Sequence, residues 1–273
     1  MSESINDLEI RLLLEAIYER YHYDFRHYSI ASVRRRLGQA LQPFGVRTVS
    51  GLQERILHQP ETFGPLLQYL TVQVSDMFRD PEYFRALRSE VLPVLATYPS
   101  LKVWVAGCSA GEEAYSMAIL LEEEGLLSRT ILYATDINQD ALRRAQTGVF
   151  ELDRMRRFTE NYRLAGGRGS LSDYYHAALG GAVMDARLRR KITFSDHSLA
   201  TDEVFAETHL VSCRNVLIYF DRELQSRALR LFRDALCPMG FLGLGAKESL
   251  RFSTVAEDFT EVDATARIYR KRA

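Results

Sequence analysis

Acidic residues stand at two points where a Rossmann-like sheet would hold a nucleotide-type cofactor. An apolar run at 103–106 ends in a turn of small residues, and Glu112 and Glu113 open the helical pattern that follows. A second apolar run ends at Asp136. A strand, a glycine-containing turn, a helix and a second strand that ends in a carboxylate are typical of a cofactor site at the carboxyl ends of a parallel sheet.

The turn itself indicates which cofactor fits. Its glycines, Gly107 and Gly111, do not match G-x-G-x-x-G, and the carboxylates of Glu112 and Glu113 would repel a pyrophosphate. The same carboxylates would attract the sulfonium and ammonium groups of S-adenosylmethionine (SAM), and Asp136 stands where an acid accepts hydrogen bonds from ribose hydroxyls. The alternative is that the two glutamates only complement the helix dipole. Taken together with Asp136, the pattern favours a SAM site.

Composition excludes several broad classes of protein. The 273 residues include 47% hydrophobic side chains, enough for a large core, and a formal net charge of -1 gives no general affinity for nucleic acid or membranes. The N-terminus has no signal-peptide pattern, and no apolar run is long enough to span a bilayer. The three cysteines are widely spaced without a C-x-x-C pair, which predicts neither a disulfide framework nor a metal site. We therefore expect a cytoplasmic protein that binds no metal.

The first third of the chain is predicted to be helical. Residues 5 to about 95 lack alternating β patterns, and the apolar side chains of Ile10, Leu13, Leu14 and Ile17 form one amphipathic stripe. Between residues 20 and 60, arginines outnumber acidic residues: Arg20, Arg26, Arg34, Arg35, Arg36, Arg47 and Arg55 stand against Asp24 and Glu54. This excess is either a solvated helix face or a docking surface for an acidic partner.

The pattern changes after Pro99, where strands alternate with helices as in βαβ units with a parallel sheet. We place a domain boundary near residue 95, with a helical domain and linker at 1–95 and an α/β domain at 96–273. Glycines between 150 and 190 do not fit the βα alternation and predict an insertion with a small β-ribbon. Further core strands are expected at 191–194, 209–213, 241–245 and 266–270.

Local signals predict where several helices begin and end. Asp80 followed by Pro81 is typical of a helix start, and Ser109 with Glu112 has the spacing of a capping box. A further helix is expected from Asn138 to Gly148.

Four blocks of the sequence resemble the chemotaxis receptor methyltransferases, the CheR family. They are TVQVSDMFRD at 71–80, AGEEAYS at 110–116, ATDIN at 134–138 and SCRNVLIYF at 212–220. The resemblance implies an enzyme that uses SAM to methylate glutamate side chains of chemoreceptors. It also implies a helical N-terminal domain, a Rossmann-like SAM-dependent methyltransferase domain and a small antiparallel β-subdomain inserted at about 165–195.

The resemblance also implies roles for individual residues. Arg79 and Tyr219 would be catalytic, with Arg79 beside the methylated carboxylate and Tyr219 near the transferred methyl group. Glu113 would hold the amino group of the methionyl part, and Asp136 the ribose hydroxyls. The full set of implied cofactor-binding residues is Gln73, Ser75, Arg79, Ala106, Gly107, Glu113, Asp136, Ile137, Ser198, Leu199, Asn215 and Val216, with Ser198 and Leu199 at the adenine and Asn215 and Val216 at the methionine end.

The chemistry of glutamate methylation requires little from the protein in acid–base terms. A glutamate has a reference pKa of about 4.3, so the nucleophile is already ionised near neutral pH and no general base is needed. The segment at 214–217 lacks the N-P-P-Y motif of amine and nucleic-acid methylation, and His197 is interpreted as a solvated loop residue rather than a site residue. Two alternatives stay open: a SAM-binding regulatory module without transfer activity, and a methyltransferase for another substrate.

The expected partner is the cytoplasmic helical region of a chemoreceptor. It would be bound through Arg34, Arg35, Arg36 and Arg47 and through the inserted β-subdomain. We expect neither nucleic-acid binding nor membrane insertion.

Overall fold

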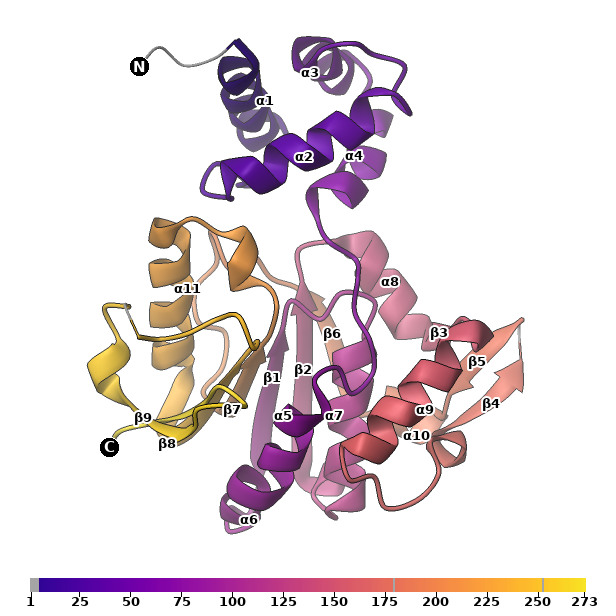
Figure 1. The fold of residues 1–273 in the computed structure, drawn as a ribbon, viewed down its shortest axis with the longest axis vertical. Helices are drawn as coiled ribbons and strands as arrows, with labels where there is room; N and C mark the ends of the chain where they lie inside the picture. Colours follow the sequence, from indigo (N-terminus) through magenta and orange to yellow (C-terminus); the bar gives the residue numbers. More distant parts are fainter. Residues whose placement is uncertain (1–4, 179, 252) are drawn as a thin grey trace.

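The computed structural model describes the whole chain except residues 1–4, 179 and 252. Its first part is a bundle of helices at the top of Figure 1, joined to the rest of the molecule through residues 71–80. These helices share a core of their own, made by apolar residues from Ile10 to Leu70. The helices are α1 (Ile5–Tyr21), α2 (Ile30–Leu41), α3 (Val49–His58) and α4 (Phe63–Leu70), with a short 3-10 turn, η1 (Pro60–Thr62), before α4.

The second part is built on a seven-stranded sheet with the order β6-β2-β1-β7-β8-β10-β9. The five strands from β6 to β8 run parallel, while β10 pairs antiparallel with both β8 and β9. The strands are β1 (Leu101–Ala106), β2 (Thr130–Asp136), β6 (Ile192–Asp196), β7 (Thr208–Cys213), β8 (Leu236–Leu244), β9 (Phe259–Asp263) and β10 (Ile268–Lys271). The chain order reverses between β1 and β7, which is the point where doubly wound sheets bind ligands.

Helices cover both faces of this sheet and create two buried apolar cores. One core includes α5, α6, α7 and α8, and the other includes α11. The bounds are α5 (Pro81–Ala86), α6 (Leu92–Leu95), α7 (Glu112–Glu123), α8 (Gln139–Thr147) and α11 (Arg222–Ala235), with a π-helical turn, η2 (Leu87–Val91), between α5 and α6.

The packing of residues 77–95 differs from the expected domain division. Phe84, Leu87, Val91 and Leu95 are buried in the same core as α7, not in the core of the N-terminal bundle. Residues 81–95 are therefore helical, as expected, but they pack on the sheet. On this packing we propose a division near residue 72 instead of residue 95, since the two cores separate there.

Three predicted helix ends are confirmed and one is corrected. The Oδ1 atom of Asn138 caps α8 by accepting a hydrogen bond from the Ala141 N–H at 3.0 Å, and Gly148 ends this helix in a left-handed conformation. The capping box at Ser109 and Glu112 is wrong, because Gly111 precedes α7 with a φ of 95° and no side chain caps it. The start predicted at Asp80 and Pro81 is confirmed, since α5 begins at Pro81 and Asp80 occupies the N-cap position without a side-chain hydrogen bond to the helix.

The insertion carries a separate antiparallel sheet with the order β3-β5-β4. Its elements are β3 (Val149–Phe150), α9 (Met155–Leu164), β4 (Tyr175–Ala178), β5 (Gly181–Met184) and α10 (Ala186–Arg189). The three-stranded subdomain expected from the family resemblance is present, and its first strand begins earlier in the chain than residue 165. Strand β4 forms one edge of this sheet.

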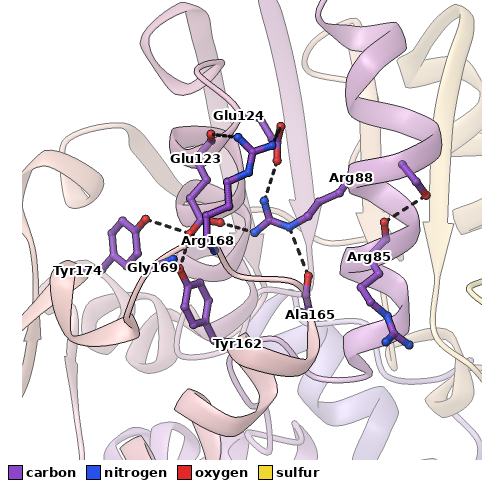
Figure 2. A network of polar contacts seen from close by, with 10 residues as sticks. Arg85, Arg88, Glu123, Glu124, Tyr162, Ala165, Arg168, Gly169 and Tyr174 are labelled. Carbon is purple, nitrogen blue, oxygen red and sulfur yellow. Dashed lines mark hydrogen bonds and ion pairs between the residues drawn. The ribbon is translucent and has the colours of Figure 1, made fainter.

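A buried carboxylate, Glu123 at the end of α7, anchors the insertion (Figure 2). Its side chain is only 3% exposed and pairs with the guanidinium of Arg88. Its Oε1 atom accepts hydrogen bonds from the Tyr174 hydroxyl at 3.1 Å, the Arg168 N–H at 3.1 Å and the Tyr162 hydroxyl. Glu123 is therefore one polar anchor of the insertion, beside the apolar side chains of the insertion that are buried in the core of the main domain.

No helix among the described residues is long and apolar enough to cross a membrane.

Candidate functional site

A cavity that is partly open to solvent lies at the carboxyl ends of β1, β2 and β7. Residues 71–75 and Arg79, together with Tyr28 and with Arg36 of α2, complete its wall, so both parts of the chain contribute to it. The residues that line it are Tyr28, Arg36, Thr71, Val72, Gln73, Val74, Ser75, Arg79, Gly107, Ser109, Glu113, Asp136, Ile137, His197, Leu199, Arg214, Asn215, Val216, Tyr219 and Phe220.

Asp136 provides an acidic group at the end of β2. Its Oδ2 atom accepts the Ser109 N–H at 2.8 Å, and Oδ1 accepts the Asn138 N–H at 2.9 Å. Burial raises the pKa of this carboxyl above its usual value, and the backbone N–H groups partly oppose that shift. Each oxygen keeps a further lone pair, so the carboxylate can also accept hydrogen bonds from ligand hydroxyls.

Gly107 brings the turn after β1 close to the turn after β7. It has a φ of 73°, and a Cβ atom placed on it would lie 2.4 Å from Cγ2 of Val216. Glycine is required here for both reasons, since the conformation is left-handed and the space is filled. The two turns therefore form a single continuous wall of the cavity.

Glu113 supplies a second acid, and its side chain is 13% exposed. Its Oε1 atom accepts the Ser212 hydroxyl at 2.6 Å, and Oε2 pairs with Nη1 of Arg214 at 3.1 Å. Glu112 does not join it, because its carboxylate is fully buried and pairs with Arg154 at 2.9 Å. Only one of the two glutamates at the start of α7 therefore faces the cavity.

The segment that carries Arg79 has an unusual backbone. Phe78 and Asp80, on either side of it, have φ values of 51° and 54°, a left-handed conformation that non-glycine residues rarely adopt. Neighbouring charges do not engage the Arg79 guanidinium: Asp80 pairs with Arg214, and Asp76 pairs with Arg154 and Arg157. Among the described residues, no carboxylate lies within ion-pair distance of the Arg79 side chain, which lines the cavity.

Tyr219 lies in a short 3-10 turn, η6 (Leu217–Tyr219), that follows β7. The turn is fixed by Glu248, which is 5% exposed and accepts the Asn215 and Ile218 N–H groups at 3.0 and 3.2 Å. The Tyr219 carbonyl also accepts the Ser29 N–H at 2.8 Å. The position of Tyr219 therefore depends on the N-terminal bundle as well as on the sheet.

The position of Arg36 differs from the one expected from the sequence. It was expected on the exposed docking surface, but it is only 5% exposed and its guanidinium carbon lies 4.5 Å from the centroid of the Tyr219 ring. Its Nη1 donates to the Leu70 carbonyl, while Nε and Nη2 have no hydrogen-bond partner among the residues that the structure describes. The physical reason is helical periodicity: Val33, Arg36, Leu37 and Ala40 all fall on the buried face of α2.

Most residues implied by the resemblance come together at the cavity, and two do not. Ala106 is 2% exposed and is covered as part of β1. Ser198 turns into its own loop, where its N–H donates to Asp202 at 2.9 Å and its hydroxyl accepts the Ala200 N–H at 3.3 Å. His197, interpreted as a solvated loop residue, is 9% exposed and lines the cavity.

Other lining residues were not foreseen from the sequence. Tyr28 comes from the loop before α2, and Ser109 donates from its hydroxyl to Gln73 at 3.0 Å. Arg214 belongs to the SCRNVLIYF block, which was the one signal that could have drawn attention to it.

The residues present fit SAM better than a dinucleotide. Two carboxylates, Asp136 and Glu113, face a cavity closed by the Gly107 turn, which suits hydroxyl donors and a cationic group. Within the described part of the chain, no three His, Cys, Asp or Glu side chains are grouped so that they could hold a metal ion. The expectation of a metal-free site stays a prediction.

Comparison with known proteins gives a consistent result. The family profile described as "CheR methyltransferase, SAM binding domain" matches residues 73–268, and "CheR methyltransferase, all-alpha domain" matches residues 8–71. A Pseudomonas putida protein named Cher3 is 61% identical over 270 residues, covering 99% of each chain. A chemotaxis protein methyltransferase 1 of Pseudomonas aeruginosa is 30% identical over 92% of each chain. One of Listeria monocytogenes is 32% identical over 67% of this chain and 68% of its own.

Proposed function

Since this chain belongs to the CheR methyltransferase family, we propose that it transfers a methyl group from SAM to glutamate side chains of chemoreceptors. One observation carries the proposal most directly. The Arg79 guanidinium, which has no carboxylate partner among the described residues, faces the same cavity as the acids Glu113 and Asp136. An arginine without a partner suits an incoming carboxylate, and the two acids suit a cationic cofactor that carries hydroxyl groups.

The cofactor would lie along the ends of β1, β2 and β7. Glu113 would accept hydrogen bonds from its amino group, Asp136 would accept them from its ribose hydroxyls, and Ile137 with Leu199 would contact the adenine. Asn215 and Val216 would border the methionine end. Bound SAM supplies an electrophilic methyl group on a positively charged sulfur.

The acceptor side needs alignment rather than proton transfer. A glutamate carboxylate is already ionised near neutral pH, with a reference pKa of about 4.3. Arg79 can orient it through paired hydrogen bonds, and the Tyr219 hydroxyl can donate one more. Charge is neutralised as the methyl group moves, so alignment of the reacting atoms and removal of water supply most of the acceleration.

Receptor docking would use the exposed arginines of the N-terminal bundle. Arg35 and Arg47 are exposed, while Arg34 is partly engaged through its ion pair with Asp7. An acidic helical surface would be attracted to this region and oriented by it. The edge strand β4 of the insertion could pair with an extended receptor segment. We expect this encounter to occur in the cytoplasm, where the helical region of a chemoreceptor lies.

The test is methyl transfer from tritiated SAM to purified receptor cytoplasmic fragments, followed by mild base treatment. Protein-bound label that base releases as methanol supports a glutamate methyl ester. Arg79→Ala is expected to abolish this label while leaving much of the affinity for S-adenosylhomocysteine (SAH), measured by calorimetry.

Tight SAH binding without any base-labile label on any receptor fragment would favour a regulatory module without transfer activity. Label that resists base would point to another type of acceptor. Either result contradicts the proposed function.

A further inference from the structure

We propose that Arg214 is a positioning residue that sets the donor side of the site, Glu113, against the acceptor side, Arg79. The inference rests on the proposed function, since it assigns Glu113 to the cofactor and Arg79 to the methylated carboxylate. Arg214 follows β7, and its side chain is 1% exposed. Its two terminal nitrogens reach in different directions, one toward each side of the cavity.

The contact of Arg214 with the donor side, here called the donor arm, is its ion pair with Glu113. Nη1 of Arg214 lies 3.1 Å from Oε2 of Glu113, while the other oxygen of this carboxylate accepts the Ser212 hydroxyl at 2.6 Å. Ser212 also lies 2.8 Å from the Tyr83 hydroxyl. With both oxygens held, the Glu113 carboxylate has one orientation, and its remaining lone pairs point to a fixed place.

The contacts of Arg214 with the acceptor side, here called the acceptor arm, are made to the Arg79 backbone and to the Asp80 side chain. Nη2 of Arg214 donates to the Arg79 carbonyl at 2.8 Å and to Oδ2 of Asp80 at 2.7 Å. The same stretch holds the left-handed residues Phe78 and Asp80, and the Phe78 N–H donates to the Ser116 hydroxyl at 2.8 Å. Strained backbone persists only where surrounding contacts hold it, and Arg214 provides two of those contacts.

The chemistry of these contacts requires arginine. The planar guanidinium reaches two carboxylates and a carbonyl at once, and it lies 4.2 Å from the centroid of the Tyr83 ring. A lysine ammonium is a single point of charge that cannot span both arms. Because the charge is buried and matched by two carboxylates, loss of either partner changes the balance at the other.

The functional consequence is a fixed distance between methyl donor and acceptor. In a displacement that depends on alignment, a misplacement of about 1 Å can reduce the rate about 100-fold. One guanidinium that touches both sides limits such errors more directly than two independent supports could. Arg214 would thereby affect the rate without touching either reacting atom.

Three variants separate the two arms. Asp80→Asn weakens the acceptor arm, so we expect kcat to fall about tenfold while the Kd for SAH stays within about twofold. Ser212→Ala weakens the donor arm, so the Kd for SAH should rise about tenfold, and kcat at saturating SAM should fall less than in Asp80→Asn. Arg214→Lys should impair both quantities. Arg230→Lys, an exposed change on α11, is the matched control and should leave both at wild-type values.

The measurements are SAH calorimetry, steady-state kinetics on a receptor fragment and thermal unfolding of each variant. Equal losses of kcat and SAH affinity in Asp80→Asn and Ser212→Ala would overturn the inference, as would wild-type behaviour of Arg214→Lys. Should Arg214→Lys fail to fold, the contrast between the other two variants decides.

Failure of the proposed function can be distinguished from failure of this inference. In that case the wild-type chain forms no methyl ester, yet SAH affinity still tests the donor arm. A loss of affinity in Ser212→Ala and Arg214→Lys but not in Asp80→Asn supports the inference, and equal affinities in all three contradict it.

Discussion

The Arg36 guanidinium packs against the Tyr219 ring, with its central carbon 4.5 Å from the ring centroid, and so joins the N-terminal bundle to the loop after β7. Both residues line the cavity. A cation held against an aromatic face limits the orientations that the ring can adopt. The helical part of the chain therefore contributes to the geometry of the site as well as to docking.

Replacement of Arg36 by methionine should lower kcat with little change in the KM for the receptor. The stacking contributes about 1 kcal/mol, so the expected loss in kcat is about fivefold. Arg35→Met, one position away on the exposed face of α2, should instead raise the KM and preserve kcat. Identical kinetic profiles for the two variants would refute the assignment of Arg36 to the site.

Replacement of Gly107 by alanine should lower both stability and cofactor affinity. The new Cβ would lie 2.4 Å from Cγ2 of Val216, and the φ of 73° is strained for alanine. The free energy of unfolding should therefore fall by about 3 kcal/mol. Gly38→Ala in α2, where nothing lies within 4 Å, should stabilise the protein by about 1 kcal/mol. Chemical denaturation and SAH calorimetry measure the two effects, and a stable Gly107→Ala chain with normal affinity would contradict them.

SAH affinity should fall as the pH is lowered, beginning above the usual pKa of an aspartate. Burial raises the pKa of Asp136, and the ionised form is the one that accepts hydrogen bonds from two hydroxyls. Asp136→Asn should bind SAH weakly near neutral pH and show a flatter pH profile. Asp140→Asn, which lies outside the cavity lining, should keep the wild-type profile.

The same carboxyl has the opposite effect on folding. Because its folded pKa lies above the unfolded one, the folded state holds the proton more tightly, and the Asp136 contribution to stability decreases as the pH rises through that window. Thermal unfolding of the ligand-free protein should show this trend weakened in Asp136→Asn. A trend of the same size in both proteins would assign it to other groups.

Removal of the Glu123 carboxylate should loosen the insertion. Glu123→Ala removes one of the two carboxylates that pair with Arg88 and leaves the hydroxyls of Tyr162 and Tyr174 without this acceptor in a nearly closed site, so we expect a loss of about 3 kcal/mol (Figure 2). Glu122→Ala, whose side chain is 39% exposed, should change stability by less than about 0.5 kcal/mol. Proteolysis within 150–185 should accelerate only in the first variant, and equal rates would count against this anchor.

Features encoded by neighbouring residues were predictable from the sequence. The ends of α8 follow from Asn138 and Gly148, whose side-chain oxygen and tolerance of positive φ act within a single turn. The strand-turn-helix pattern of the cofactor site was predictable for the same reason, since neighbouring residues encode it. The capping box failed because Gly111 ends the turn just before α7, and spacing alone does not show which residue occupies that position.

Features that depend on distant parts of the chain were not predictable in this way. Helical periodicity places Arg36 on the buried face of α2, but the partners of its guanidinium, Leu70 of α4 and Tyr219, lie far along the sequence. Arg214 contacts Asp80 and Glu113 only because β7 lies beside β1 in the sheet. Strand β9 is stabilised by pairing with β10 and carries no strong alternating pattern of its own.

The joint between the two parts combines side-chain and backbone contacts. An antiparallel bridge pairs Tyr28 with Phe220, and the backbone of Ser29 and His27 bonds to Tyr219 and Asp221 at 2.8 Å each. Since the cavity has walls on both sides of this joint, a ligand that touches both binds only when the joint is closed. By mass action, such a ligand at 100 times its Kd stabilises the closed joint by about 2.7 kcal/mol. The free energy needed to detach the bundle from the sheet therefore rises with the occupancy of the cavity.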